Sequence, residues 1–234
     1  MSALRSALGL LSRTPLHPQW LIGRRILPLA VRSATGVVLD VGAGDRWIER
    51  WLTDGSCYIA LDYPATGQDL YSARPDVFAD AARLPLGDAS IDMVVSFEVI
   101  EHVRYPEAAL AEIARTLKPG GRACLSMPFL YPVHDAPHDF QRWTSHGWSR
   151  SAGEAGLEVV CVQPAGSAIE TAALLGCLAI SGPLQGRPSW QVLIAVPIVI
   201  PMVVLINLMG WTLSRVWPAW SAVSIGLHVE LRKP

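Results

Sequence analysis

Charged side chains are scarce in this chain of 234 residues, of which Asp, Glu, Lys and Arg make up only 17%. An ordinary globular protein has about 25%. The shortage is local, because between Val159 and Val229 the only formally charged residues are Glu170, Arg187 and Arg215. Hydrophobic residues make up 51% of the chain, which excludes global disorder. The formal net charge of −1 also argues against a protein that binds polyanions through its overall charge.

The cysteines lack the spacing of a metal site or a disulfide framework. Cys57, Cys124, Cys161 and Cys177 form no CxxC pair and no tight cluster. All four lie in apolar runs, where a free thiol packs as a small hydrophobic group. The sequence therefore predicts free cysteines and favours a reducing compartment.

A secretory signal is also missing from the N-terminal segment. The apolar run at residues 6–12 is short, and no small-residue cleavage site follows it. Residues 1–39 contain five arginines and no acidic residue, and Leu4, Leu8 and Leu11 recur at helical spacing. Two interpretations stay open: a basic amphipathic helix on an anionic membrane, or a lid helix packed on the domain.

Short apolar runs alternate with helical patterns along most of the chain. The runs predict strands at 37–41, 57–62, 76–80, 91–97, 122–128, 157–163 and 221–231, and the helical patterns cover 46–53, 106–117 and 144–156. This alternation predicts an α/β fold with a mainly parallel seven-stranded sheet and helices on both faces. Ligands then bind beyond the carboxyl ends of the strands.

A glycine turn follows the first strand, in the segment VLDVGAGD at 38–45. The position of a third dinucleotide-type glycine is Trp47, and no GK[ST] follows, so neither an NAD fingerprint nor a P-loop is present. Asp40 lies where it would repel a pyrophosphate, and it suits a cofactor with a cationic amino-acid end. Asp62 ends the second strand, where a carboxylate can accept ribose hydroxyls. Asp80, beside Ala81, ends the third, where an adenine amino group can be recognised.

These motifs resemble the class I S-adenosylmethionine-dependent methyltransferases of the type 11 group, which have a Rossmann-like fold. The resemblance rests on VLDVGAGD (38–45), ALDYP (60–64), 79–103, LKPGGRACLSMP (117–128) and AGLEVV (155–160). It implies a methionine-end cradle at Asp40, Gly42, Ala43 and Gly44, ribose contacts at Asp62 and Tyr63, adenine contacts at Asp80 and Ala81, and a pocket floor at Ser96, Phe97 and Glu98. Arg46 departs from the pattern, because many members have a third glycine there.

Candidate catalytic bases follow the fourth and fifth predicted strands. Glu98, Glu101 and His102 form an E-x-x-E-H pattern, and His134 and His138 lie in the later segment 131–144. Both segments begin at the carboxyl edge of the sheet, so they can converge on one pocket. A histidine has a free pKa close to neutrality. We therefore predict His138, His102 and Glu101 as the catalytic residues.

The same residues leave a metal-dependent interpretation open. The E-x-x-E-H pattern with a later histidine resembles metal-assisted O-methyltransferases that act on RNA ribose ends. Glu98, Glu101, His102 and His138 would then hold a divalent ion. The pattern also occurs in metal-free members, so we predict a site without a metal. No basic stripe with interleaved aromatic residues is present, so a nucleic-acid substrate is not expected.

The segment HDFQRWT at 138–144 resembles bacterial members of the group that accompany surface-glycan synthesis. Asp139, Arg142 and Trp143 would suit a sugar, which offers both hydroxyls and apolar ring faces. The alternative is a structural loop that is fixed by a buried Trp143. The sequence predicts a glycan or lipid-linked saccharide as substrate and leaves this alternative open.

The apolar third of the chain centres on residues 192–209, which carry no charge and are flanked by Trp190 and Trp211. The length of this stretch and its flanking tryptophans are close to those of a transmembrane helix. Pro197 and Pro201 weaken the pattern, because each proline removes a hydrogen-bond donor from the helix. Because strands precede and follow this stretch in one sheet, the chain must return to the side that it left. We expect a hairpin that enters one leaflet, with a double span and a soluble cap or dimer interface as alternatives.

The sequence thus predicts three parts: a basic N-terminal segment at 1–36, a methyltransferase core at 37–165 completed by 221–234, and an apolar helical insertion at 166–220. We expect O-methylation of a glycan or lipid-linked saccharide, with S-adenosylmethionine as cofactor, on the cytoplasmic face of the inner membrane. A quinone precursor is the alternative acceptor, and a non-catalytic cofactor-binding scaffold is the alternative class.

Overall fold

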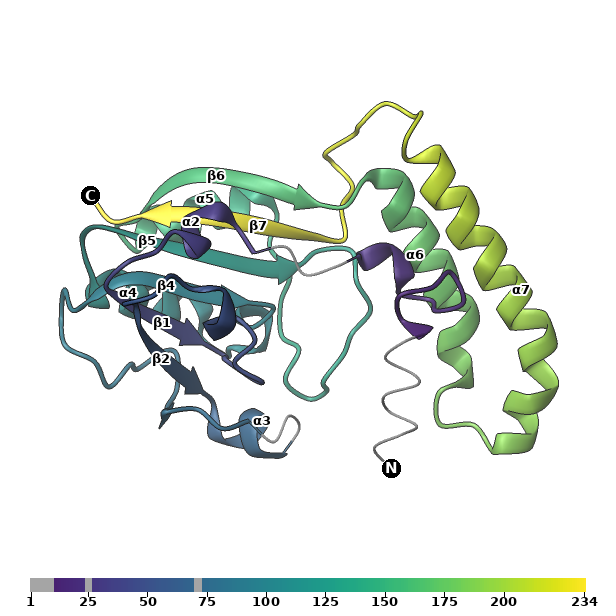
Figure 1. Cartoon of the computed structure of the whole chain (residues 1–234), viewed down its shortest axis with the longest axis horizontal. Helices are drawn as coiled ribbons and strands as arrows, with labels where there is room; N and C mark the ends of the chain where they lie inside the picture. Colours follow the sequence, from purple (N-terminus) through teal and green to yellow (C-terminus); the bar gives the residue numbers. More distant parts are fainter. Residues whose placement is uncertain (1–10, 24–26, 70–72) are drawn as a thin grey trace. The chain divides into compact units, whose positions relative to one another are not determined.

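The computed structural model describes residues 11–23, 27–69 and 73–234, and these residues divide into two compact units (Figure 1). The sheet unit contains residues 27–163 and 226–234, and the hairpin unit contains residues 11–23 and 164–225. Most of the predicted basic N-terminal helix lies outside the described residues. Of the predicted N-terminal segment at 1–36, residues 11–23 group with the apolar insertion and residues 27–36 with the sheet unit.

Among the described residues, seven strands form one sheet in the order β3-β2-β1-β4-β5-β7-β6. The strands are β1 (Val37–Val41), β2 (Cys57–Asp62), β3 (Val77–Phe78), β4 (Ile91–Phe97), β5 (Leu117–Pro128), β6 (Glu158–Ala165) and β7 (Gly226–Arg232). The pairs from β3 through β5 are parallel, and β7 runs antiparallel to β5. The predicted mainly parallel, seven-stranded α/β sheet is therefore confirmed.

Short helices connect the strands of the sheet unit. They are α2 (Leu29–Arg32), α3 (Pro64–Asp69), α4 (Pro106–Thr116) and α5 (Ser145–Glu154), with 3-10 turns η2 (Glu49–Trp51) and η3 (Ile100–His102). The side chain of Thr144 caps α5 by accepting a hydrogen bond from the Gly147 amide at 3.1 Å, as its position before the helix predicts. The predicted α-helix at 46–53 is wrong: only the turn η2 forms there.

The core of the sheet unit lies on both faces of the sheet. Leu39, Val94 and Leu125 belong to one fully buried cluster, while Val38 and Val95 belong to another. Alternate residues of a strand point to opposite faces, so each strand contributes to both clusters. This two-sided burial explains why β1 and β4 are nearly continuous apolar runs.

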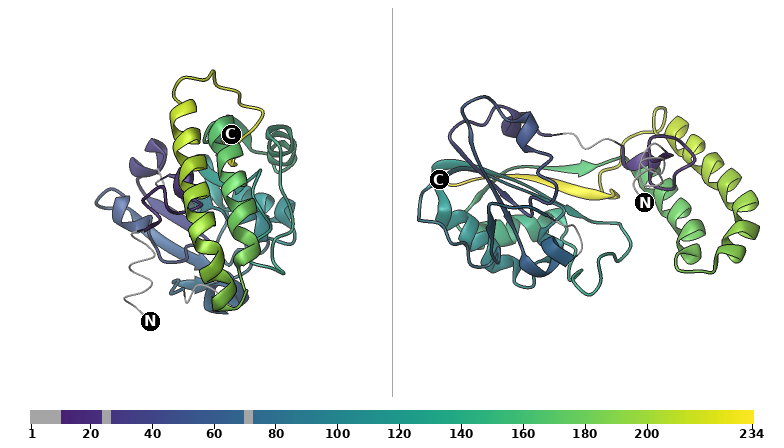
Figure 2. Two further views of the ribbon diagram at one scale, coloured as in Figure 1. Left: turned by 90° about the vertical axis from the view of Figure 1, so that its right-hand side faces the viewer. Right: turned by 60° about the horizontal axis from the view of Figure 1, so that its bottom comes forward.

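The hairpin unit is built from two apolar helices joined by a short turn. They are α6 (Ala168–Ser181) and α7 (Ser189–Leu213), with the 3-10 turns η1 (Trp20–Ile22) and η4 (Gly182–Leu184). Figures 1 and 2 show α6 and α7 side by side, running in opposite directions. At Gly210 the helices approach so closely that an added Cβ would lie 2.5 Å from the Ala173 Cβ.

The surface of α7 is apolar on nearly every side. Its buried residues are only Val203, Asn207 and Gly210, and the Asn207 side chain donates to the backbone carbonyls of Pro15 and His17. Large apolar side chains elsewhere on the helix are exposed: Trp190, Leu193, Ile194, Ile198, Ile200, Met202, Leu205, Leu208, Met209, Trp211 and Leu213. Among the described residues, α7 is the one helix long and apolar enough to cross a membrane, by length and composition.

Candidate functional site

The glycine turn after β1 is tight and leaves no room for larger residues. Gly42 has a φ of 78°, and an added Cβ would lie 2.3 Å from Val99 Cγ2, so only glycine fits. The amides of Gly42 and Ala43 donate to the Leu61 carbonyl at 2.8 and 3.1 Å, which fixes the turn against β2. Around Gly44 the space that a Cβ would occupy is open, so a ligand can approach the backbone there.

Asp40 is a buried carboxyl group at the end of β1. It is 2% exposed, and Tyr58 Oη donates a hydrogen bond of 2.6 Å to its Oδ2. Burial raises the pKa of Asp40 from 3.8 to about 7, and the Tyr58 hydrogen bond opposes that shift only in part. A bound cation beside Asp40 would favour its ionised form. The residue therefore suits the ammonium end of an amino-acid ligand.

Asp62 lies beside the glycine turn, at the end of β2. Its two carboxyl oxygens accept hydrogen bonds from the Gly44 amide at 2.9 Å and the Tyr63 amide at 2.8 Å. Burial raises its pKa, although these two bonds oppose the shift. Each oxygen keeps a further lone pair, which is what a ribose diol requires.

Asp80 and Ala81 follow β3 at the same edge of the sheet. Asp80 is exposed, and its carboxylate accepts a hydrogen bond of 2.9 Å from the Ala82 amide, which fixes a local turn. Ala81 is buried in the core. The pair thus presents an exposed turn, rather than a deep pocket, at the position predicted for adenine.

Arg46 adopts a backbone conformation that favours glycine, with a φ of 56°. Its guanidinium pairs with Glu49 at 3.0 Å and Asp76 at 2.9 Å, and lies over the Tyr58 ring at 5.1 Å. Although position 46 is arginine rather than glycine, the backbone keeps the left-handed turn. Side-chain contacts hold the arginine in the conformation that glycine would adopt freely.

The predicted floor residues lie at and beyond the end of β4. The hydroxyl of Ser96 is buried with no hydrogen-bond partner among the described residues. The ring of Phe97 lies between those of Trp47 at 6.1 Å and His228 at 6.3 Å. Glu98 has a φ of 57°, and its carboxylate accepts a hydrogen bond of 2.5 Å from Ser126. Together with the acidic, glycine-lined turn, these residues fit S-adenosylmethionine.

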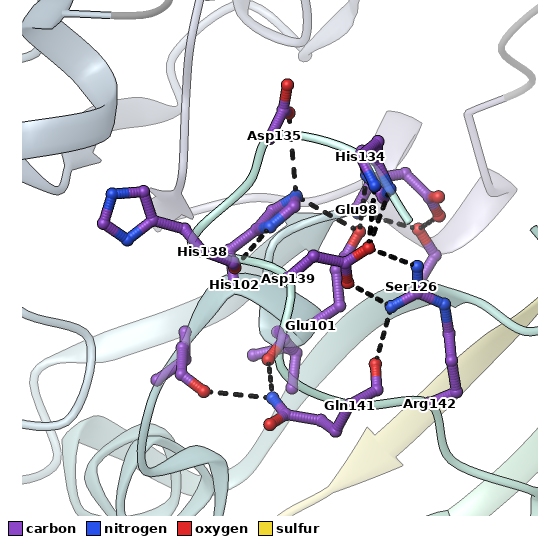
Figure 3. Close-up of polar contacts among 12 residues, drawn as sticks. Glu98, Glu101, His102, Ser126, His134, Asp135, His138, Asp139, Gln141 and Arg142 are labelled. Atoms are coloured by element: carbon purple, nitrogen blue, oxygen red, sulfur yellow. Dashed lines mark hydrogen bonds and ion pairs between the residues drawn. The ribbon is translucent and has the colours of Figure 1, made fainter. Parts of the chain in front are cut away.

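A second polar cluster surrounds Glu101, which is fully buried (Figure 3). Neither of its carboxyl oxygens has a hydrogen-bond partner among the described residues. Its Oε1 lies 3.6 Å from His102 Nε2 and 3.8 Å from His134 Nε2. Burial, and secondarily the charge of Glu98, raise the pKa of Glu101 to about 9. This shift favours the protonated, neutral form of its carboxyl group.

The predicted histidines occupy different environments. His102 Nδ1 is 2.8 Å from the His138 backbone carbonyl, and burial lowers the His102 pKa. The His138 side chain points away from Glu101, as Figure 3 shows. His134 joins Glu101 and His102 instead, and its Nδ1 lies 3.2 Å from Asp139 Oδ2. The structure thus brings Glu101, His102 and His134 together and leaves the His138 side chain outside the cluster.

The segment proposed to contact a sugar is held by internal contacts. Arg142 binds Asp139 through both of its terminal nitrogens, one of them at 2.7 Å, and this pairing lowers the pKa of Asp139 to about 2. Trp143 packs edge-on against the fully buried Trp148 with a ring separation of 5.0 Å. These contacts agree with the alternative interpretation, in which residues 138–144 form a structural loop rather than a sugar-binding segment.

Two residues near the site were missed by sequence reasoning. Tyr58 pairs in register with Val38, so Tyr58 and Asp40 share one face of the sheet. That alternation was readable from the two strands. His228 lies opposite Ser126 in the β5–β7 pairing, with a buried Nδ1 that has no partner among the described residues. The place of His228 beside β5 could not be predicted, because it depends on the order of the strands in the sheet, and no local sequence pattern gives that order.

The sheet unit matches known proteins in both sequence and structure. Residues 39–125 match a family model described as "Methyltransferase domain". The protein from Mycolicibacterium smegmatis named "Probable S-adenosylmethionine-dependent methyltransferase" is 38% identical over 105 residues, which cover 43% of this chain and 41% of that protein. The demethylmenaquinone methyltransferase of Mycobacterium bovis is 38% identical over 103 residues, covering 42% and 44%. The matches thus span about two fifths of these relatives.

A solved structure extends the likeness to the whole fold. The S-adenosylmethionine-dependent methyltransferase from Mesorhizobium loti superposes with a TM-score of 0.52 at 16% identity, covering 93% of this chain and 98% of that one. At this identity the likeness concerns the fold alone.

Proposed function

Because residues 39–125 match a methyltransferase domain, we propose that this chain is a class I S-adenosylmethionine-dependent methyltransferase that acts on an acceptor held at a membrane surface. The cofactor, when bound, supplies an electrophilic methyl group on a sulfonium. The chain's own residues bind and orient it: Asp40 holds the ammonium end, Asp62 holds the ribose, and the open space at Gly44 admits the backbone contact. The methyltransferase part of the proposal rests on this edge of the sheet, where the buried carboxyl groups of Asp40 and Asp62 lie beside a turn that only glycine can form at position 42.

The apolar surface of α7 supports the membrane part of the proposal. Leu193 is 71% exposed and Ile198 65% exposed, and the surrounding positions are also apolar. A soluble monomer rarely exposes a continuous apolar surface of this size. Trp190 is exposed in the first turn of α7, and Trp217 and Trp220 are exposed after its end. Tryptophan is enriched at the membrane interface.

The hairpin geometry favours insertion into one leaflet over a full span. The α6 helix has 14 residues, which is a length of about 21 Å, against a hydrocarbon core of about 30 Å. The Ile225 amide donates to the Ala165 carbonyl at 3.1 Å, so the chain enters and leaves the hairpin unit at one point. We therefore propose a monotopic anchor that enters from the cytoplasmic side.

For the acceptor we propose an oxygen of a lipid-linked saccharide. An oxygen nucleophile must lose a proton, ideally to a base with a pKa near neutrality. The candidates are His102 and His138, and His102 is the one adjacent to Glu101. Much of the remaining rate enhancement would come from holding the nucleophile in line with the methyl group.

A quinone precursor is the second candidate acceptor. Relatives named as demethylmenaquinone methyltransferases favour it, and an isoprenoid acceptor would also lie in the membrane that α7 contacts. The internal pairing of Arg142 with Asp139 also leaves fewer groups free for a sugar.

Transfer of a labelled methyl group from S-adenosylmethionine tests the proposal. The full chain is incubated with membrane extract, and the product is partitioned between polar-glycan and apolar-lipid fractions. We expect label in a lipid-linked glycan. Label in the apolar quinone fraction would select the second candidate. Cofactor binding without any transfer would contradict both and favour the scaffold alternative.

A further inference from the structure

We propose that Glu101, His102 and His134 form a binding site for one divalent transition-metal ion. The ligand atoms are one carboxyl oxygen of Glu101 and the Nε2 atoms of the two histidines. This set differs from the one suggested by the E-x-x-E-H pattern, because Glu98 and His138 take no part in it. None of its three residues is among those predicted to contact the cofactor at the ends of β1 to β4.

The spacing of the three groups fits a single ion. One potential ligand atom from each residue lies within 4.8 Å of the other two. Glu101 Oε1 is 3.6 Å from His102 Nε2 and 3.8 Å from His134 Nε2. Two ligands of one tetrahedral Zn²⁺, each at about 2.1 Å, lie roughly 3.4 Å apart. Small side-chain movements would therefore bring all three onto one ion.

Both imidazoles are held so that Nε2 is the free nitrogen. His102 Nδ1 contacts the His138 carbonyl at 2.8 Å, and a carbonyl can only accept, so the Nδ1 proton is fixed there. His134 Nδ1 lies 3.2 Å from the Asp139 carboxylate, which fixes the same tautomer. Metal-bound histidines almost always donate their other N–H to a carbonyl or carboxylate.

Glu101 is difficult to explain without a ligand. Its side chain is fully buried, yet both oxygens lack a hydrogen-bond partner among the described residues. Leaving a buried polar group unpaired costs about 1–3 kcal/mol in stability. A cation between the carboxylate and the two imidazoles would satisfy the group that the protein fold leaves unpaired.

The neighbouring charges do not compete for the site. Arg142 is engaged by Asp139, and Glu98 is engaged by Ser126. The carboxylate of Asp135 lies 3.9 Å from His102 Nε2, so a further oxygen faces the same side of the cluster. Three protein ligands leave coordination positions open, as in catalytic rather than structural sites.

The ligand chemistry selects the class of ion. Two imidazoles and one carboxylate suit Zn²⁺, Fe²⁺, Co²⁺ and Mn²⁺, whereas Mg²⁺ and Ca²⁺ prefer all-oxygen sites. If the proposed methyl transfer to an oxygen is correct, an open position would hold the acceptor hydroxyl and lower its pKa, and His102, as a ligand of the ion, would not be the base. That role rests on the proposed function, whereas the site itself does not.

The site can be tested by titrating Zn²⁺ and Mn²⁺ into the chelator-treated full chain in detergent micelles, with calorimetry as the readout. We expect one ion per chain and no comparable binding of Mg²⁺. Glu101→Gln and His134→Ala should each weaken binding more than about 100-fold, and Asp139→Asn about 10- to 100-fold. His138→Ala is the matched control and should bind like the unmodified chain.

Two further measurements keep the outcome clear if a variant folds poorly. Co²⁺ loaded into the unmodified chain should give the visible absorption of a site with nitrogen ligands. A separate S-adenosylmethionine titration on each sample measures cofactor binding. Loss of metal binding with cofactor binding intact would then be distinguished from failure of the proposed methyltransferase function. Absence of stoichiometric binding, or equal losses in His138→Ala and His134→Ala, would overturn the site.

Discussion

The sheet unit and the hairpin unit place apolar side chains in opposite ways. In the sheet unit, side chains such as Leu39 and Val94 are fully buried between the sheet and its helices. In α7, Leu193 and Ile198 are largely exposed, while the polar Asn207 is completely buried. Burial of apolar surface stabilises a fold in water. The sheet unit follows this rule within its own chain, whereas the described residues leave most apolar side chains of α7 exposed.

We infer from this contrast that the sheet unit binds the cofactor and the hairpin unit binds the membrane. The acids and glycines that fit the cofactor all belong to the sheet unit, and the exposed apolar surface belongs to the hairpin unit. Substitutions in one unit should therefore leave the other property unchanged. The following predictions test this separation, starting with the largest expected effect.

The first prediction concerns membrane binding. Ile198→Glu combined with Leu205→Glu places two carboxylates on the exposed face of α7, at a cost of about 2.5 kcal/mol each if that face enters hydrocarbon. We expect the affinity for vesicles of anionic and zwitterionic phospholipids to fall more than about 100-fold. Flotation of the full chain with these vesicles measures the loss.

Ser145→Glu with Ser149→Glu is the matched control, because it adds the same charge at exposed positions of α5 in the sheet unit. This variant should float like the unmodified chain. Both double variants should keep the same affinity for S-adenosylmethionine. Equal flotation of the two would show that α7 does not contact the bilayer.

The second prediction concerns Asp40. Asp40→Asn keeps an acceptor for the Tyr58 hydroxyl but removes the charge, so S-adenosylmethionine affinity should fall about 30-fold, the effect of a lost charge-assisted hydrogen bond of about 2 kcal/mol. Calorimetry measures the affinity. Vesicle binding should not change. A variant that kept full affinity would remove Asp40 from the cofactor site.

The same variant should be more stable than the unmodified chain above neutral pH. The pKa of Asp40 is raised in the folded state, so its stabilising protonated form is lost as pH rises through about 7. Asn cannot ionise and avoids that loss. The melting temperature of Asp40→Asn should therefore exceed that of the unmodified chain at pH 8, and the difference should narrow as the pH falls from about 7 toward 4.

The third prediction is the pH dependence of cofactor binding. A ligand ammonium needs Asp40 ionised, and the raised pKa of about 7 means that this form is depleted at pH 6. We expect the affinity of the unmodified chain to fall about tenfold from pH 8 to pH 6, since each unit below a pKa reduces the ionised fraction tenfold. In Asp40→Asn this dependence should disappear. A flat profile in the unmodified chain would contradict the assignment.

Much of the sheet could be predicted from sequence because burial on both faces produces continuous apolar runs. The strands at 37–41, 57–62 and 91–97 have the predicted bounds. The segment at 46–53 differs because Arg46 takes a left-handed conformation, held by ion pairs to Glu49 and to Asp76, which is distant in sequence. Local helical pattern cannot anticipate such tertiary contacts.

The cluster around Glu101 was less predictable. Sequence spacing places the His102 and Glu101 side chains near β4, but the segment after β5 has no periodicity that decides between His134 and His138. A tertiary contact makes the choice between the two histidines. The Asp139 carboxylate accepts a hydrogen bond of 3.0 Å from the His134 amide, and this bond sets the course of the backbone there. The His138 carbonyl, rather than its ring, then faces His102.

The most direct test of the account is the rate of methyl transfer to an acceptor presented in two forms. Membrane lipids from the labelled extract are offered either in vesicles or dispersed in detergent micelles. We predict that Ile198→Glu with Leu205→Glu transfers methyl groups at the unmodified rate in micelles but more than about tenfold more slowly in vesicles, because only the anchor is lost. Equal rates in vesicles would contradict the claim that the hairpin unit brings the methyltransferase domain to its substrate.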